Sequence, residues 1–159
     1  MKKDKHILPV LVLCTLVIVF GLLYFFAPGV DGRNDYHPVV LSFDVLKKWT
    51  YIEGKTQIPD FIRAFDGKTV DITGYMMALD TFDNIKSFIL VPSLFGCCYG
   101  QPPAVNHVVM VKMAGGKRAK YFEDAIRVRG RFHCGEEKYE GELLSLYRID
   151  ADMVDSKSP

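Results

Sequence analysis

Residues 126–132 read Ile-Arg-Val-Arg-Gly-Arg-Phe, and this stretch decides the fold class. Apolar and polar side chains alternate in it almost strictly, which is the period of a strand with one buried face. A glycine inside such a strand, here Gly130, marks a bulge or a bend. The stretch Thr69–Leu79 also alternates and carries Gly74. Two strands with bending glycines indicate a tightly coiled sheet, as in small barrels.

The chain has five strand-like segments, separated by turn signals. They predict a mainly β fold, namely a small five-stranded OB-like barrel whose strands share one curved, mainly antiparallel sheet. A small two-sheet sandwich is the second choice. The five segments are Thr69–Leu79, Phe88–Val91, Val108–Met113, Ile126–Phe132 and Leu143–Ala151.

Two short helices are expected before the first of these strands. Ser42 can cap a helix through Asp44–Lys47 with its side chain. A second helical turn is expected at Pro59–Phe65, because Pro59 suits the first position of a helix. Ile62 should then face the core.

The N-terminus predicts a membrane anchor. An apolar run extends from Ile7 to Ala27 and follows a tip that contains three lysines. About 20 apolar residues span a bilayer as a helix, and flanking lysines favour a cytoplasmic N-terminus. A cleaved signal peptide is the competing interpretation, but its apolar core would be shorter, about 7–15 residues. We therefore predict a single-pass protein of the inner (cytoplasmic) membrane, with the remainder on the extracytoplasmic side.

The chain of 159 residues is long enough for one domain with its own core. We divide it into a cytoplasmic tip and transmembrane anchor (1–27), a linker (28–38), an extracytoplasmic OB-like domain (39–152) and a polar tail (153–159). The net charge of +1 gives no reason to expect a nucleic-acid partner. Catalytic motifs such as a nucleophile elbow, a phosphate loop or a dinucleotide fingerprint are absent, so enzymatic activity is not predicted.

An irregular segment, Gly96–Pro103, contains adjacent cysteines at Cys97 and Cys98. Together with His107 and Cys134 they form a candidate metal site, because thiolate and imidazole suit zinc or copper. His133, next to Cys134, belongs to the same constellation, but we expect it at an exposed turn.

Rival interpretations of the cysteines stay open. An oxidising compartment favours a disulfide from Cys97 or Cys98 to Cys134. A strained bridge between Cys97 and Cys98 would be a redox switch, since strain raises the reduction potential. Buried thiols that only fill space are the third interpretation. His107 would, as the simpler alternative, satisfy backbone groups of its loop.

Three arginines, Arg127, Arg129 and Arg131, line one face of the alternating strand. OB-like barrels bind nucleic acids or sugars on such faces. With a near-neutral charge and an extracytoplasmic location, we interpret these arginines as a solvated strand face.

Several segments in this order resemble a bacterial exported family that is catalogued as domain of unknown function 3299. The resemblance covers roughly the last two-thirds of the chain and implies an envelope protein with a small β-rich domain. Some members of the family are associated with metal-transport systems, which supports the metal hypothesis. The segments are Gly67–Met76, Phe88–Pro92, Cys98–Pro103, Asn106-His107 and Ser145–Arg148.

These observations predict a membrane-anchored binding or accessory module of the cell envelope, with metal handling as one form of that role. Its expected partners are the membrane and envelope proteins, and no small-molecule ligand can be named. The alternatives are a thiol-based redox protein that uses Cys97 and Cys98, and a structural scaffold domain.

Overall fold

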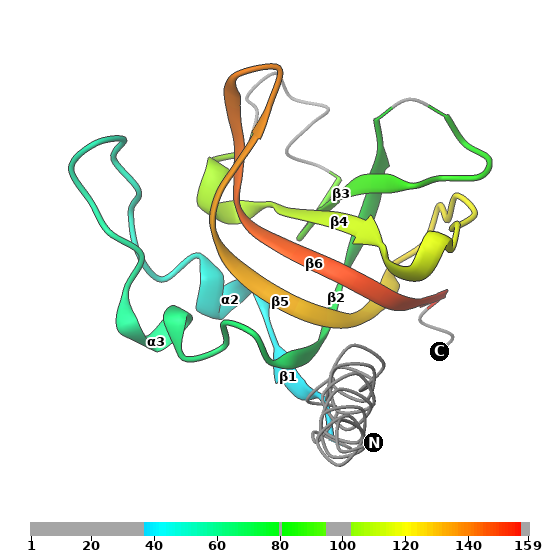
Figure 1. Cartoon of the computed structure of the whole chain (residues 1–159), viewed down its shortest axis with the longest axis horizontal. Helices are drawn as coiled ribbons and strands as arrows, with labels where there is room; N and C mark the ends of the chain where they lie inside the picture. The colour runs from blue at the N-terminus through cyan, green and yellow to red at the C-terminus, as the bar shows by residue number, and fades with distance from the viewer. Residues whose placement is uncertain (1–36, 80, 95–102, 157–159) are drawn as a thin grey trace, which may run out of the picture. The chain divides into compact units, whose positions relative to one another are not determined.

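The computed structural model describes residues 37–79, 81–94 and 103–156 (Figure 1). Two short helices, α2 (Phe43–Leu46) and α3 (Asp60–Arg63), precede most of the strands. Two short 3-10 turns, η1 (Val105–His107) and η2 (Ala114–Gly116), flank the fourth strand. The strands are β1 (Val39–Leu41), β2 (Thr69–Ala78), β3 (Ser87–Val91), β4 (Val109–Met113), β5 (Ile126–Tyr139) and β6 (Glu142–Ser156).

All six strands belong to one sheet, and five of them close into a ring of pairings in the order β2, β3, β4, β6, β5 and back to β2. Within the ring only β4 and β6 run parallel, and the other pairs are antiparallel. β1 adds to β2 in parallel outside the ring. The prediction of a mainly β fold with short helices is confirmed, and each of the five predicted segments forms a strand in one mainly antiparallel sheet. Two separate sheets, the second choice, do not occur among the described strands.

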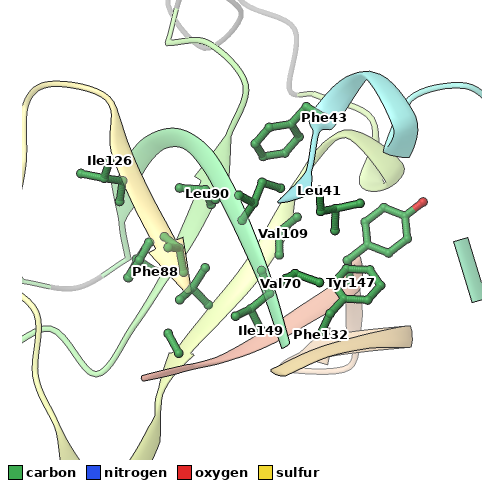
Figure 2. Close-up of a cluster of buried hydrophobic side chains, with 14 of the residues drawn as sticks. Leu41, Phe43, Val70, Phe88, Leu90, Val109, Ile126, Phe132, Tyr147 and Ile149 are labelled. Atoms are coloured by element: carbon green, nitrogen blue, oxygen red, sulfur yellow. The ribbon is translucent and has the colours of Figure 1, made fainter. Parts of the chain in front are cut away.

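The core of the described residues lies inside this ring. The alternation in β5 points Ile126, Val128 and Phe132 inward, where each side chain is fully buried. Figure 2 shows Phe132 beside Tyr147, in a cluster to which every strand of the ring contributes. Complete burial of one large apolar side chain contributes about 1.5–3 kcal/mol, so this cluster supplies the main driving force for folding.

The two bending glycines lie where strands approach closely. A Cβ atom added at Gly130 would stand 2.2 Å from the carbonyl oxygen of Asp150, and one at Gly74 would stand 2.7 Å from that of Val91. The β5–β6 register shifts between Arg129 and Gly130. The predicted bend at Gly130 is therefore a β-bulge with its partner strand pressed against the backbone.

The boundaries of three elements differ from the expectation. β5 continues to Tyr139, and β6 continues to Ser156, inside the segment predicted as a polar tail. β1 was not predicted at all. Backbone pairing explains these differences, because Tyr139 pairs with Glu142, Ser156 with Ile126 and Val39 with Val70.

The helix starts also need correction. The side chain of Ser42 makes no capping hydrogen bond, and its backbone oxygen instead accepts from the amides of Val45 and Leu46. Pro59 stands just before the first residue of α3 rather than within it. Ile62 is fully buried, as expected.

The predicted anchor (1–27) and nearly all of the predicted linker lie outside the described residues. Among the residues that the structure does describe, no helix has the length and apolar character needed to cross a bilayer.

Candidate functional site

The structure describes only two of the four residues of the predicted metal site. Cys97 and Cys98 lie outside the described residues, whereas His107 ends η1 and Cys134 lies in β5. Within the described ranges, no three His, Cys, Asp or Glu side chains gather closely enough to hold a metal ion. A site built from His107 and Cys134 would need ligands from outside these ranges.

His107 is half-buried at the start of β4. Its backbone amide donates to the carbonyl oxygen of Ala104 at 2.7 Å. Burial lowers the pKa of His107, and the positive charge of Lys47 lowers it further. The imidazole is therefore held in its neutral form, which is the form that ligates metals.

Cys134 is half-buried on β5, opposite Tyr147 of β6. It forms no disulfide with any described residue. Burial raises the pKa of the Cys134 thiol, the carboxylate of Asp66 raises it further, and Arg63 opposes the change. The protonated thiol is a poor nucleophile, so this cysteine lacks the activation that a thiol enzyme requires.

His133 does not lie at an exposed turn, which corrects the prediction. It is half-buried within β5, and its Nε2 atom lies 3.1 Å from Oδ2 of Asp150 on β6. Asp150 also pairs with Arg148 at 3.2 Å, and Arg148 lies 3.5 Å from Glu137. Lys112 of β4 completes this cross-strand group through its own ion pair with Glu137. The prediction of a turn rested on the nearby Gly135, but β5 continues through this glycine to Tyr139.

The arginine face of β5 is tied to neighbouring strands. Arg129 donates from Nε and Nη2 to the two carboxylate oxygens of Asp71 at 2.9 and 2.8 Å. Arg127 lies 3.7 Å from the carboxylate of Asp155. These two side chains support the pairing of β5 with β2 and β6.

The family segment Asn106-His107 contains a buried structural residue. Asn106 is 3% exposed, and its Nδ2 atom donates to the carbonyl oxygen of Trp49 at 2.6 Å. The indole Nε1 of Trp49 donates to the hydroxyl of Tyr147 at 2.8 Å. The Tyr147 hydroxyl in turn donates to the carbonyl oxygen of Leu46 at 3.4 Å. This group, called here the Trp49 clamp (Trp49, Asn106, Tyr147), fixes the segment after α2 against η1 and β6.

Ser145, in the last family segment, plays a similar part. It is 1% exposed, and its hydroxyl lies 2.9 Å from the carbonyl oxygens of Val108 and Tyr147 and accepts from the Tyr147 amide at 3.0 Å. Residues that carry the family resemblance thus maintain the fold. Tyr147 lies inside the predicted strand Leu143–Ala151, but its hydrogen bond could not be predicted, because a partner 98 positions away leaves no local signal.

A second apolar cluster lies on the opposite face of β3 and β4 from the core. Ile89 and Val91 of β3 pack there against Val108 and Met110, and all four are buried. β3 is consequently buried on both faces, as its continuous apolar run predicts.

The open cavities along the described surface include two of similar volume. One has a volume of about 520 Å³ and is bordered by β1, α2 and the arginine end of β5, including Asp44, Lys47 and Arg127. The other, of about 510 Å³, is bordered by the chain after η2 and by the end of β6.

The described residues thus define a small, mainly β domain on a closed ring of strands. A family model described as "Protein of unknown function (DUF3299)" matches residues 47–156. The chain belongs to this family, which confirms the resemblance seen in the sequence. None of the curated proteins compared with the chain matches it.

A solved structure has the same fold. The chain is similar to the crystal structure of a DUF3299 family protein from Pseudomonas aeruginosa PAO1, with a TM-score of 0.58 and 22% sequence identity. The match covers 77% of this chain and 98% of that chain.

Proposed function

We propose that this protein is a membrane-anchored accessory module of the cell envelope, and that its ring of strands is an OB-like barrel that binds a ligand or partner. The order of pairing around the ring carries the proposal. Two antiparallel steps (β2–β3–β4) lead to a parallel pair (β4–β6), and β5 closes the ring on β2. OB-like barrels bind oligonucleotides and oligosaccharides through one face and its adjoining loops.

Binding fits the described residues better than catalysis does. The buried polar groups of the Trp49 clamp and Ser145 are occupied with hydrogen bonds that hold strands and turns together. Asp71 and Glu137 lie in ion pairs with cations of neighbouring strands, and Asp150 pairs with Arg148 of its own strand. Groups held in this way stabilise the scaffold rather than transfer protons to a substrate.

The anchor and linker complete the proposal. Residues 1–27 would cross the membrane, and the lysines at the tip would keep the N-terminus in the cytoplasm. The short linker predicted over residues 28–38 would keep the domain close to the bilayer surface. An accessory protein placed there meets envelope partners at a high effective concentration.

Membrane vesicles of both orientations test this placement. Protease added outside right-side-out vesicles should digest the β domain and leave a membrane-bound fragment that contains residues 1–27. Inverted vesicles should protect the domain. A mature chain that begins near Pro28, or digestion of the domain from the cytoplasmic side, would defeat the proposal.

Metal handling is a second candidate, because half-buried His107 and Cys134 offer an imidazole and a thiol, which are ligand types of zinc and copper. Zinc or copper(I) would bind through His107 with thiolates of Cys97, Cys98 or Cys134. The full chain should then retain metal after desalting, and the double variant Cys97→Ser/Cys98→Ser should lose it. Cys14→Ser, in the predicted span, is the matched control. Reversible oxidation of Cys97 or Cys98 without bound metal would favour the redox alternative, and an inert disulfide would favour a scaffold.

A further inference from the structure

The cavity beside η2 is lined by both cationic and apolar residues. We call it the basic pocket and define it by Lys117, Arg118, Lys120, Met113, Phe122 and Val154. The three cations are exposed, whereas the three apolar residues are half-buried and pack against the core. Its volume of about 510 Å³ is within the range of small-molecule sites, roughly 300–1,000 Å³.

The cations of the basic pocket have no acidic partner in the part of the chain that the structure describes. Lys117 donates from Nζ to the backbone oxygen of Asp152 at 2.8 Å. Arg118 donates from Nη1 to the backbone oxygens of Gly116 and Lys117 at 2.7 and 2.9 Å. Neutral carbonyl oxygens orient these side chains without cancelling their charge. Asp152 is the one acidic residue of the lining, against three cationic residues.

The backbone that carries the cations is fixed before any ligand arrives. Gly115 and Gly116 adopt φ angles of 60° and 73°, which glycine tolerates without strain, and they turn the chain back after β4. Ala119 then pairs with Ile85 through two backbone hydrogen bonds of 3.0 Å. The cations therefore extend from an ordered segment, which reduces the entropy lost on binding.

From these features we propose that the basic pocket binds an organic anion, a phosphate ester or carboxylate that carries an apolar group. The anionic end would meet Arg118 and Lys120, and the apolar group would cover Phe122 and Val154. Charge-assisted hydrogen bonds to the anion and burial of the apolar group would both contribute to affinity. The inference rests on the proposed binding role and names its ligand class. The anion could be a soluble ester or the headgroup of a phospholipid.

Benzyl phosphate is a suitable soluble probe. The full chain, labelled with nitrogen-15 in phosphatidylcholine nanodiscs, would be titrated while amide resonances are recorded. Saturable shifts are expected at residues 117–120 and 152–154, and binding should weaken as salt screens the exposed cations. Shifts at the same amides when phosphatidylglycerol replaces part of the lipid, without benzyl phosphate, would identify the headgroup as the source.

Two variants and one control separate the contributions of the cationic and apolar residues of the basic pocket. Arg118→Gln/Lys120→Gln should weaken benzyl phosphate binding roughly tenfold or more, because it removes two cations from the anion site. Lys48→Gln/Lys55→Gln changes two exposed lysines outside the pocket and should leave affinity unchanged. Met153→Gln alters another apolar group of the lining and should weaken benzyl phosphate but not inorganic phosphate.

Absence of saturable shifts at residues 117–120, or equal affinity in Arg118→Gln/Lys120→Gln and wild type, overturns the inference. Dispersed amide spectra of each variant show that it has folded. The vesicle experiment is independent of this titration. If benzyl phosphate does not bind but the vesicle experiment gives the expected placement, only the ligand proposal is wrong. If benzyl phosphate binds but the placement differs, the envelope role is wrong and the ligand proposal stands.

Discussion

At the scale of single residues, the Tyr147 hydroxyl connects parts of the chain that are distant in sequence. It accepts from Trp49 and donates to the carbonyl oxygen of Leu46, inside a ring otherwise filled with apolar side chains. Tyr147→Phe keeps the ring of the side chain but leaves the indole N–H without this acceptor. The free energy of unfolding should fall by about 1–2 kcal/mol, as for other buried hydrogen bonds that lose one partner.

The measurement is denaturant unfolding of the full chain, followed by fluorescence of Trp49, the single tryptophan of the sequence. Tyr139→Phe is the matched control, because Tyr139 is 55% exposed and should change stability by less than about 0.5 kcal/mol. Equal effects of the two substitutions would show that the clamp does not stabilise the fold.

Tyr147 also predicts a loss of stability at alkaline pH. Burial raises the pKa of Tyr147 to about 12 from an ordinary value near 10.0. Between these values the unfolded chain has released the phenolic proton while the folded chain retains it, so stability falls as pH rises. The loss should be about 2–3 kcal/mol across this window. Unfolding at several pH values should give a shallower decline for Tyr147→Phe than for wild type, and identical slopes would contradict the assignment.

The burial of a side chain could be predicted from the sequence more easily than its hydrogen-bond or ion-pair partner. Alternation correctly placed Val128 and Phe132 inside, because side-chain direction in a strand follows from position alone. It could not show that Asn106 bonds to Trp49 or that His133 faces Asp150, since those partners come from other elements. The roles of Cys97 and Cys98 stay predictions.

At the scale of elements, the bulge in β5 depends on glycine, which has no side chain, at position 130. Gly130→Ala would place a Cβ atom 2.2 Å from the Asp150 oxygen and 2.7 Å from the Ala151 Cα atom, so β6 must move away. We expect a loss of about 1–3 kcal/mol or more, as for other overpacked sites.

Gly135→Ala is a closely matched control on the same strand, because a Cβ atom there meets nothing within 4 Å. Thermal unfolding of the two variants should show a lower midpoint for Gly130→Ala alone. Equal midpoints would mean that β6 can yield at the bulge without cost.

Element positions were better predicted than element ends. Apolar residues located all five strands of the ring, because each strand buries at least one face against the core. β5 beyond Cys134 is held by pairing with β6, whereas β1 and the end of β6 each add one apolar side chain, Leu41 and Val154, to the core besides pairing with β2 and β5. A single core residue in so short a stretch gives no period, so the sequence could not reveal these extensions.

At the scale of the whole molecule, bending glycines and five strands indicated a coiled sheet, but not which strands close it. Closure depends on two seams, β2 with β5 and β4 with β6, whose residues are far apart in sequence. The pairing of Ile72 with Val128 and of Val111 with Ile149 brings these segments together. The parallel seam, in particular, needs a crossover that no local motif specifies.

Backbone nuclear Overhauser effects across these two seams are the most direct test of the ring on which the proposed function rests. In the labelled full chain, we expect antiparallel contacts between Ile72 and Val128 together with parallel contacts between Val111 and Ile149. Both sets should appear in one molecule. Contacts at only one seam, as in two separate sheets, would contradict the closed ring and with it the proposed OB-like barrel.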